Sequence, residues 1–164
     1  MGTIYVDNIK EHTTGNGVKI PGHVIQVQHS QSTTQVTTQN TLLHVPTDTG
    51  LAVSITPKFI TSKMLVMINA GARGDGGTAW VNLMIKRDNN LIDYSPCTDN
   101  GILDYGINHT AGRFSVIFED LAGSTDTTEY RLFFSRYGGS GTSAFNNNGN
   151  HYSLSTMTVM EVSA

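Results

Sequence analysis

The sequence predicts an all-β protein, and three observations support that prediction. No window of about 11 or more residues repeats apolar positions at helical spacing without Gly or β-branched interruptions. Short runs that alternate apolar and polar side chains occur along most of the chain. The polar residues are mainly Thr, Ser, Asn and Gln, and the 17 Gly and 4 Pro suit strands joined by tight turns. With 164 residues, the chain is expected to fold as one unit.

The first half of the chain contains four predicted strands. Residues 24–28 and 51–56 alternate apolar with polar side chains, which predicts two half-buried strands, and Pro57 ends the second one. Residues 63–70 are apolar on both faces, so this segment is expected to be a central strand covered from both sides. Residues 80–86 place apolar side chains at every second position and form the fourth predicted strand.

The second half repeats the same pattern. The Asp and Asn residues at 88–90 are expected to form the turn of a hairpin that continues in residues 91–94. Further strands are expected at residues 114–118, 130–135 and 152–162. About eight to ten strands separated by turns favour an antiparallel sandwich, a jelly roll or a barrel.

Composition excludes several classes of partner. Charged residues make up 14% of the chain and the formal net charge is −3, which offers no basic surface for nucleic acid. The longest purely apolar run, residues 64–68, is too short to span a bilayer, and no signal peptide is recognised, so no membrane association is expected. Cys97 is the one cysteine, and we expect it to be a buried apolar residue in a protein made in a reducing cytosol.

No catalytic or metal-binding pattern is present, so we expect neither enzyme activity nor a cofactor. The six His are scattered without the spacing of a metal site. Residues 88–94 and 99–105 resemble each other, and their acidic residues lack the spacing of a calcium loop, which favours Asx turns. A sugar-binding module or a polysaccharide hydrolase stays open as an alternative. Its paired carboxylates would come from Asp93, Asp104, Glu119 and Asp120.

Two Gly-rich segments are expected to be loops. Residues 137–151 contain mostly Gly, Ser, Asn and Thr, and a loop of this length is either functional or a simple connection. Its candidate ligand-contact residues are Tyr137, Phe145, Asn146, Asn147 and Asn148. In the second segment, residues 71–77, the further candidate contact residues are Arg73, Gly74 and Asp75. They spell the integrin-recognition tripeptide at a predicted hairpin tip, although a tight turn alone accounts for the glycines.

Five stretches carry a resemblance to a known group of proteins. They are TIYVDNI at residues 3–9, GVKIPGHVIQV at 17–27, LAVSITP at 51–57, TSKMLVM at 61–67 and STMTVMEV at 155–162. These stretches resemble the tail-fibre and other virion-surface proteins of tailed phages, especially marine and cyanobacterial ones. The resemblance extends over nearly the whole chain and consists of strand patterns.

The resemblance implies a jelly-roll sandwich similar to the tumour-necrosis-factor and C1q heads, assembled as a homotrimer. Residues 23–164 would form the sandwich, and residues 1–22 an extended arm for attachment or for the trimer. The apolar positions of this arm are Ile4, Val6, Ile9, Val18 and Ile20. A low charge and an apolar strand near the C-terminus are compatible with an oligomer that buries sheet edges.

The implied function is that of a virion protein, assembled in the host cytoplasm and exposed on the particle. Its partners would be other copies of itself, other phage proteins and a host glycan or protein that the loops contact. The arm is short and the chain shows no heptads or collagen-like triplets, which keeps a second interpretation open. In that alternative the chain is a capsid decoration protein that braces the phage head.

Overall fold

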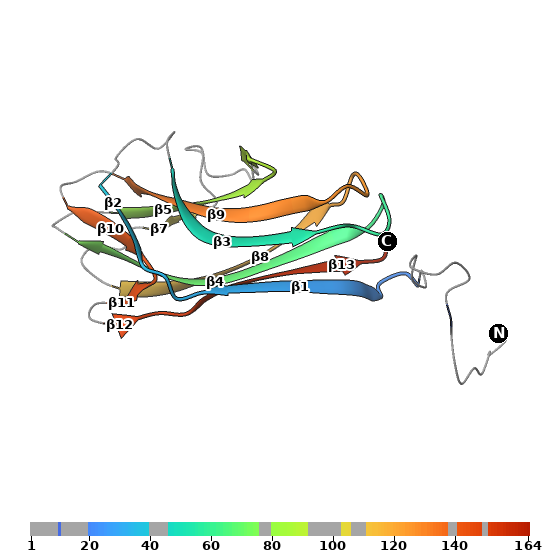
Figure 1. The fold of residues 1–164 in the computed structure, drawn as a ribbon, viewed down its shortest axis with the longest axis horizontal. Helices are drawn as coiled ribbons and strands as arrows, with labels where there is room; N and C mark the ends of the chain where they lie inside the picture. The colour runs from blue at the N-terminus through green and yellow to red at the C-terminus, as the bar shows by residue number, and fades with distance from the viewer. Residues whose placement is uncertain are drawn as a thin grey trace.

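The computed structural model describes residues 10, 20–39, 46–75, 80–91, 103–105, 111–137, 141–148 and 151–164. All the regular elements in these ranges are strands, which confirms the prediction of an all-β protein. Two antiparallel sheets pack face to face, with β1, β13, β4 and β8 in one layer and β3, β9 and β5 in the other (Figure 1). Within the described part of the chain, no helix is long and apolar enough to span a membrane.

The first sheet is centred on the long strand β4. Its strands are β1 (Val24–Ser32), β2 (Val36–Thr38), β4 (Lys63–Asp75), β8 (Ala111–Leu121), β10 (Thr142–Phe145) and β13 (Ser155–Val162). On one side, β4 pairs first with β13 and then with β10, and these lead to the edge strands β1 and β2. On the other side, β4 pairs along its length with β8.

The second sheet has the order β3-β9-β5, and β6 and β7 both pair with β5. Its strands are β3 (Thr47–Ile55), β5 (Trp80–Arg87), β6 (Asn90–Leu91), β7 (Leu103–Tyr105) and β9 (Thr128–Tyr137). A separate two-stranded ribbon joins β11 (Asn147–Asn148) to β12 (His151–Tyr152).

The hydrophobic core lies between the two sheets, and the two-residue period of each strand places every second side chain in it. On β5, the predicted buried positions Val81, Leu83 and Ile85 all lie in the core. The largest side chains that fill the interior are Tyr130, Phe134, Phe145, Leu51 and Met64.

The predicted hairpin after β5 is confirmed in part, since Asn90 belongs to β6 rather than to the turn and residues 92–94 lie outside the described residues. Lys86 pairs with Leu91 and Arg87 with Asn90, so Asp88 and Asn89 are the two residues of the turn. Both have positive φ, 49° and 65°, as a type I′ turn requires. Asp and Asn tolerate this conformation better than most residues.

Two expectations about individual segments were wrong. Residues 63–70 are not covered from both sides, because Met64 and Val66 are buried while Leu65 and Met67 on the opposite face are half-buried. Residues 137–151 are not one loop, since they include β10 and part of the small ribbon. The strand β10 forms because its backbone pairs with β4 and β2, although the Gly-rich composition predicts a loop.

Candidate interaction surface

The outer face of the first sheet carries a band of apolar side chains. Cross-strand pairing places Met160 beside Leu65, and Met67 beside Ile117. Val27 pairs with Met160, so the band extends to the edge strand β1. These residues alternate along their strands with core residues and therefore point away from the core.

Several side chains of this band are accessible. Ile117 is 67% exposed and Val27 is 48% exposed, although the sequence pattern placed Val27 on the buried face of its strand. Leu65, Met67 and Met160 are half-buried by their neighbours in the sheet. Scattered exposed apolar residues are ordinary, whereas a contiguous group on one sheet face indicates a contact surface. We call these five residues the outer band.

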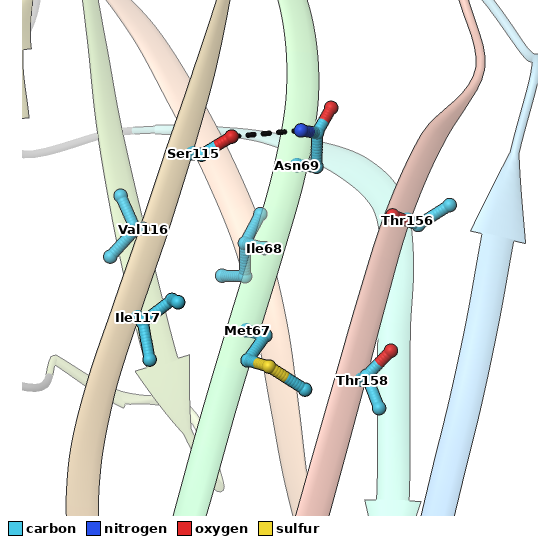
Figure 2. A pocket seen from close by; sticks show the side chains of 8 residues that line it. All are labelled: Met67, Ile68, Asn69, Ser115, Val116, Ile117, Thr156 and Thr158. Atoms are coloured by element: carbon cyan, nitrogen blue, oxygen red, sulfur yellow. Dashed lines mark hydrogen bonds between the residues drawn. The ribbon is translucent and has the colours of Figure 1, made fainter.

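A shallow groove on this face includes Met67 and Ile117 of the outer band (Figure 2). It is lined by Met67, Ile68, Asn69, Ser115, Val116, Ile117, Thr156 and Thr158. At its upper end in Figure 2, Asn69 Nδ2 donates to Ser115 Oγ at 2.8 Å, while Met67, Ile117 and Thr158 lie in its lower part. The groove therefore offers both apolar side chains and hydrogen-bonding groups.

Charged groups lie at the margins of this face. Lys63 Nζ and Glu119 Oε1 form an exposed ion pair at 3.0 Å near one end. At the other end, Arg113 donates to the Asn69 side chain and to the carbonyl oxygen of Leu154. Lys63 and Glu119 thus neutralise each other, and the Arg113 guanidinium has hydrogen-bond partners within the chain. Both arrangements lower the penalty for covering the face with another protein.

The outer face of the second sheet has a different character. Met84 and Phe133 are buried there, and Lys86 Nζ lies 4.6 Å from the centre of the Phe133 ring. Arg131 donates to Glu129 and to Asp48, and these hydrogen bonds raise the pKa of the guanidinium above its usual value. The accessible apolar band is therefore a feature of the first sheet.

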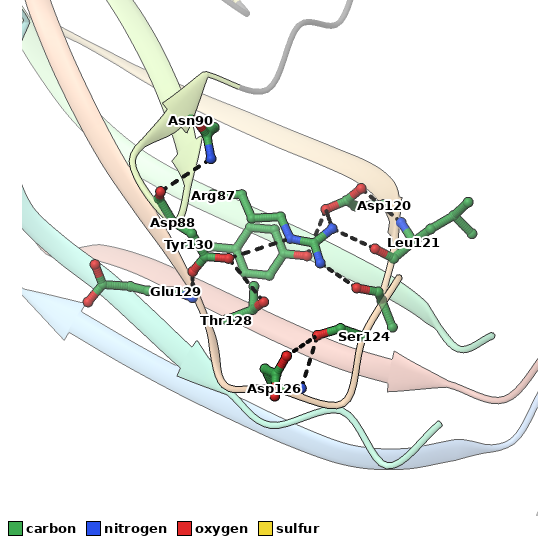
Figure 3. A network of polar contacts seen from close by, with 11 residues as sticks. Arg87, Asp88, Asn90, Asp120, Leu121, Ser124, Asp126, Thr128, Glu129 and Tyr130 are labelled. Atoms are coloured by element: carbon green, nitrogen blue, oxygen red, sulfur yellow. Dashed lines mark hydrogen bonds and ion pairs between the residues drawn. The ribbon is translucent and has the colours of Figure 1, made fainter. Parts of the chain in front are cut away.

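A polar network joins the two sheets at one end of the sandwich (Figure 3). Arg87 donates to Asp120 Oδ2 at 3.0 Å and to the backbone carbonyls of Leu121 and Ala122. The hydroxyl of Tyr130 donates to the same Asp120 oxygen at 2.8 Å. Burial of this hydroxyl, and secondly the charge of Asp120, raise the Tyr130 pKa well above its ordinary value. The network fixes the connection from β8 to β9.

A buried carboxylate fixes the neighbouring connection from β3 to β4. Glu161 Oε1 accepts hydrogen bonds from the amides of Lys58 and Phe59 at 2.8 and 3.1 Å. Its Oε2 accepts from Gln26 Nε2 at 2.6 Å, and Gln26 also donates to the Thr56 carbonyl. Sequence reasoning missed Glu161. The available signal was its position in β13, because Met157, Val159 and Glu161 share the inward face.

Two predicted contact residues are buried, which corrects the prediction that they are exposed for a ligand. Phe145 and Asn146 are both 0% exposed. Asn146 has a φ of 55°, and its side-chain amide donates to the carbonyls of Ser32 and Thr34 at 3.0 Å each. Its Oδ1 accepts from Ser155 Oγ. Asn146 therefore connects β1, β10 and β13 from inside the protein.

The remaining predicted contact residues lie within strands. Arg73 and Gly74 belong to β4 and pair with Ala144 and Ser143 of β10, and Asp75 is the last residue of β4. The tripeptide is therefore held in the sheet rather than at the tip of a hairpin. Backbone pairing places Tyr137 in β9, and Asn147 and Asn148 in β11.

The other predicted residues are not brought into one site. Ile20 is exposed just before β1, whereas Ile4, Val6, Ile9 and Val18 lie outside the described residues, as do Cys97 and Asp93. Glu119 and Asp120 are consecutive on β8 and point to opposite faces, with Lys63 and Arg87 as their respective partners. Asp104 lies in β7, opposite Asn82 of β5.

No group of three His, Cys, Asp or Glu side chains within the described ranges is placed to hold a metal ion. Comparison with known proteins gives no relative, since no protein-family model and no curated protein matches this chain.

Proposed function

We propose that this protein is a structural component of a tailed-phage virion, a homotrimeric surface protein of the tail-fibre type with a jelly-roll sandwich. The observation that carries the proposal is the outer band, Val27, Leu65, Met67, Ile117 and Met160, on one face of the first sheet. A single copy leaves this band in water. In a self-assembling particle protein, the next copy covers such a band.

The order of the strands supports the jelly roll. The first sheet contains the series β1-β13-β4-β8, and the second contains β3-β9-β5-β7. When these eight strands are numbered in chain order, the two series become 1-8-3-6 and 2-7-4-5. Two interlocked Greek keys produce this order in an eight-stranded jelly roll.

The chemistry of the outer face supports self-association. Its centre is apolar, Lys63 and Glu119 at its margin form an ion pair, and Arg113 is hydrogen-bonded within the chain. The strand β8 has a pairing partner on one side among the described strands, and burial of such an edge in an oligomer prevents uncontrolled pairing. In a ring of three copies every contact surface is covered by a neighbour. Head-to-tail contacts that do not close into a ring continue into a filament.

A second candidate, the capsid decoration protein, is favoured by the burial of predicted receptor contacts. Phe145 and Asn146 are inside the protein, and Gly74 is paired in the sheet. A protein that braces a shell needs no exposed receptor loop, whereas a receptor-binding tip does. The outer band serves the trimer equally in both roles.

Localisation on the particle tests this proposal. Purified particles are labelled with antibodies against the protein and examined by electron microscopy, and the copy number is measured by quantitative mass spectrometry. A few copies at the tail support the fibre, and many copies over the head support decoration. Absence of the protein from purified particles contradicts both.

A further inference from the structure

Two exposed apolar residues lie on neighbouring backbone segments at the end of the sandwich where the polar network lies. Ile60 and Leu121 are each 61% exposed. Leu121 pairs with Lys63, and the amide of Gly123 donates to the carbonyl of Ile60 at 3.1 Å, which holds the two connections together. We call Ile60 and Leu121 the base patch.

The base patch is held on a rigid support. Glu161 binds the amides of Lys58 and Phe59 immediately before Ile60, and Arg87 binds the carbonyl of Leu121 at 2.6 Å. Apolar side chains on a fixed backbone lose little conformational freedom when a partner covers them. An exposed pair of this kind is therefore suited to binding.

The chain enters its first strand from this same end. The amide of Gly22 donates to the carbonyl of Ser163 at 2.8 Å, and the amide of Ser163 donates to the carbonyl of His23 at 2.9 Å. Residues 20–23 therefore lie beside the C-terminus, at the β1 edge of the first sheet. The base patch lies at the opposite edge, where β8 ends.

The position of the chain entry suggests an occupant for the base patch. Head-to-tail contacts in a ring join two different surfaces of the protein. In a ring that sets the β1 edge of one copy against the β8 edge of the next, the segment before β1 comes near the neighbour's base patch. An extended chain spans about 3.3 Å per residue, so ten residues reach about 33 Å, which is wider than a sheet of four strands. The preceding sequence supplies the apolar residues Ile4, Val6 and Ile9 among polar ones.

We propose that the base patch of each copy binds the N-terminal segment, residues 3–18, of a neighbouring copy. This inference rests on the proposed self-association, since it requires a neighbour. It adds a second contact to the trimer, made by chain exchange at the end of β8 rather than by the outer band itself. The apolar side chains of the segment cover Ile60 and Leu121, and the braced connections keep the patch in position.

Site-specific photo-crosslinking in the full chain tests this contact. Ile60 is replaced by benzoylphenylalanine, and copies labelled with a heavy isotope are assembled together with unlabelled copies before irradiation. We expect crosslinks from position 60 to residues 3–18 that join a labelled to an unlabelled copy. The same probe at Ser54, exposed on the other sheet, serves as the control and should give no crosslink to that segment.

A second variant tests the role of apolar contact. Val6→Asp in the chain that carries the probe should lower the crosslink yield about tenfold, because a buried valine contributes about 1.5 kcal/mol or more. Asp7→Asn should leave the yield unchanged. Crosslinks to another segment, crosslinks within one copy, or none from position 60 overturn the inference. A trimer without this crosslink overturns the inference alone, whereas a monomer overturns the proposed assembly as well.

Discussion

Tyr130 and Asp120 connect the two sheets, because the buried hydroxyl on β9 donates to a carboxylate oxygen on β8 at 2.8 Å. Arg87 on β5 binds the same oxygen, so one carboxylate holds two strands of the opposite sheet. The contact also closes the end of the sandwich that carries the base patch.

The stability of the protein should fall in the alkaline range through Tyr130. The pKa of its hydroxyl is raised in the folded state, so the unfolded chain releases this proton first, above about pH 10. The contribution of the Tyr130 hydroxyl to stability is fully present below that pH and decreases as the pH rises. Denaturant unfolding between pH 7 and 11 should show this decrease, and Tyr130→Phe should reduce it.

At neutral pH, Tyr130→Phe should lower the free energy of unfolding by about 1.5 to 3 kcal/mol, because a hydrogen bond to a charged acceptor is lost. Equal stability of the variant and the wild type at pH 7 would show that the bond to Asp120 contributes nothing.

The buried carboxylate of Glu161 should be important for stability. Glu161→Gln replaces one acceptor oxygen by a donor that faces backbone amides, so we expect a loss of about 1 to 3 kcal/mol in unfolding free energy. Glu119→Gln is the matched control. It removes an exposed ion pair with Lys63 and should change stability by less than about 1 kcal/mol. Similar losses for both variants would contradict the assignment.

Asn146 combines a side-chain role with a backbone role, and two variants separate them. Asn146→Ala should lower the unfolding free energy by about 3 kcal/mol, since it removes buried hydrogen bonds and keeps a Cβ at positive φ. Asn146→Gly should lose about 1 kcal/mol less, because Gly adopts this φ without strain. If the Gly variant is the less stable of the two, the positive φ is not a source of strain.

Much of the fold follows from local sequence patterns. The alternation of Val81, Leu83 and Ile85 determines which face of β5 is buried, and two residues that accept positive φ determine the turn at Asp88 and Asn89. Each of these signals lies within a few residues of the element that it predicts.

Other features depend on contacts between distant parts of the chain. Glu161 is buried because the connection at Lys58 brings two amides to it, and Asn146 is buried because Ser32 and Thr34 accept its hydrogen bonds. A pattern shows which side chains share a face, but it does not show what covers that face. For the same reason, apolar residues on both faces of 63–70 predict a strand covered from both sides, whereas the structure leaves its outer face half-buried.

The outer band should control assembly. Ile117→Lys places a charge in the middle of the proposed contact and should convert the oligomer to monomers without unfolding it, because the side chain is exposed in a single copy. Ser54→Lys adds the same charge to an exposed position on the other sheet and should leave assembly unchanged. Sedimentation velocity, with circular dichroism to verify folding, compares the two variants. An oligomer that tolerates the charge at position 117 would place the contact elsewhere.

The mass of the wild-type chain in solution tests the central claim most directly. Light scattering coupled to gel filtration should give about 53 kDa, three times the 17.7 kDa of one chain, and this value should persist on dilution. A mass of one chain at all concentrations, with the outer band left in water, would contradict the proposed assembly.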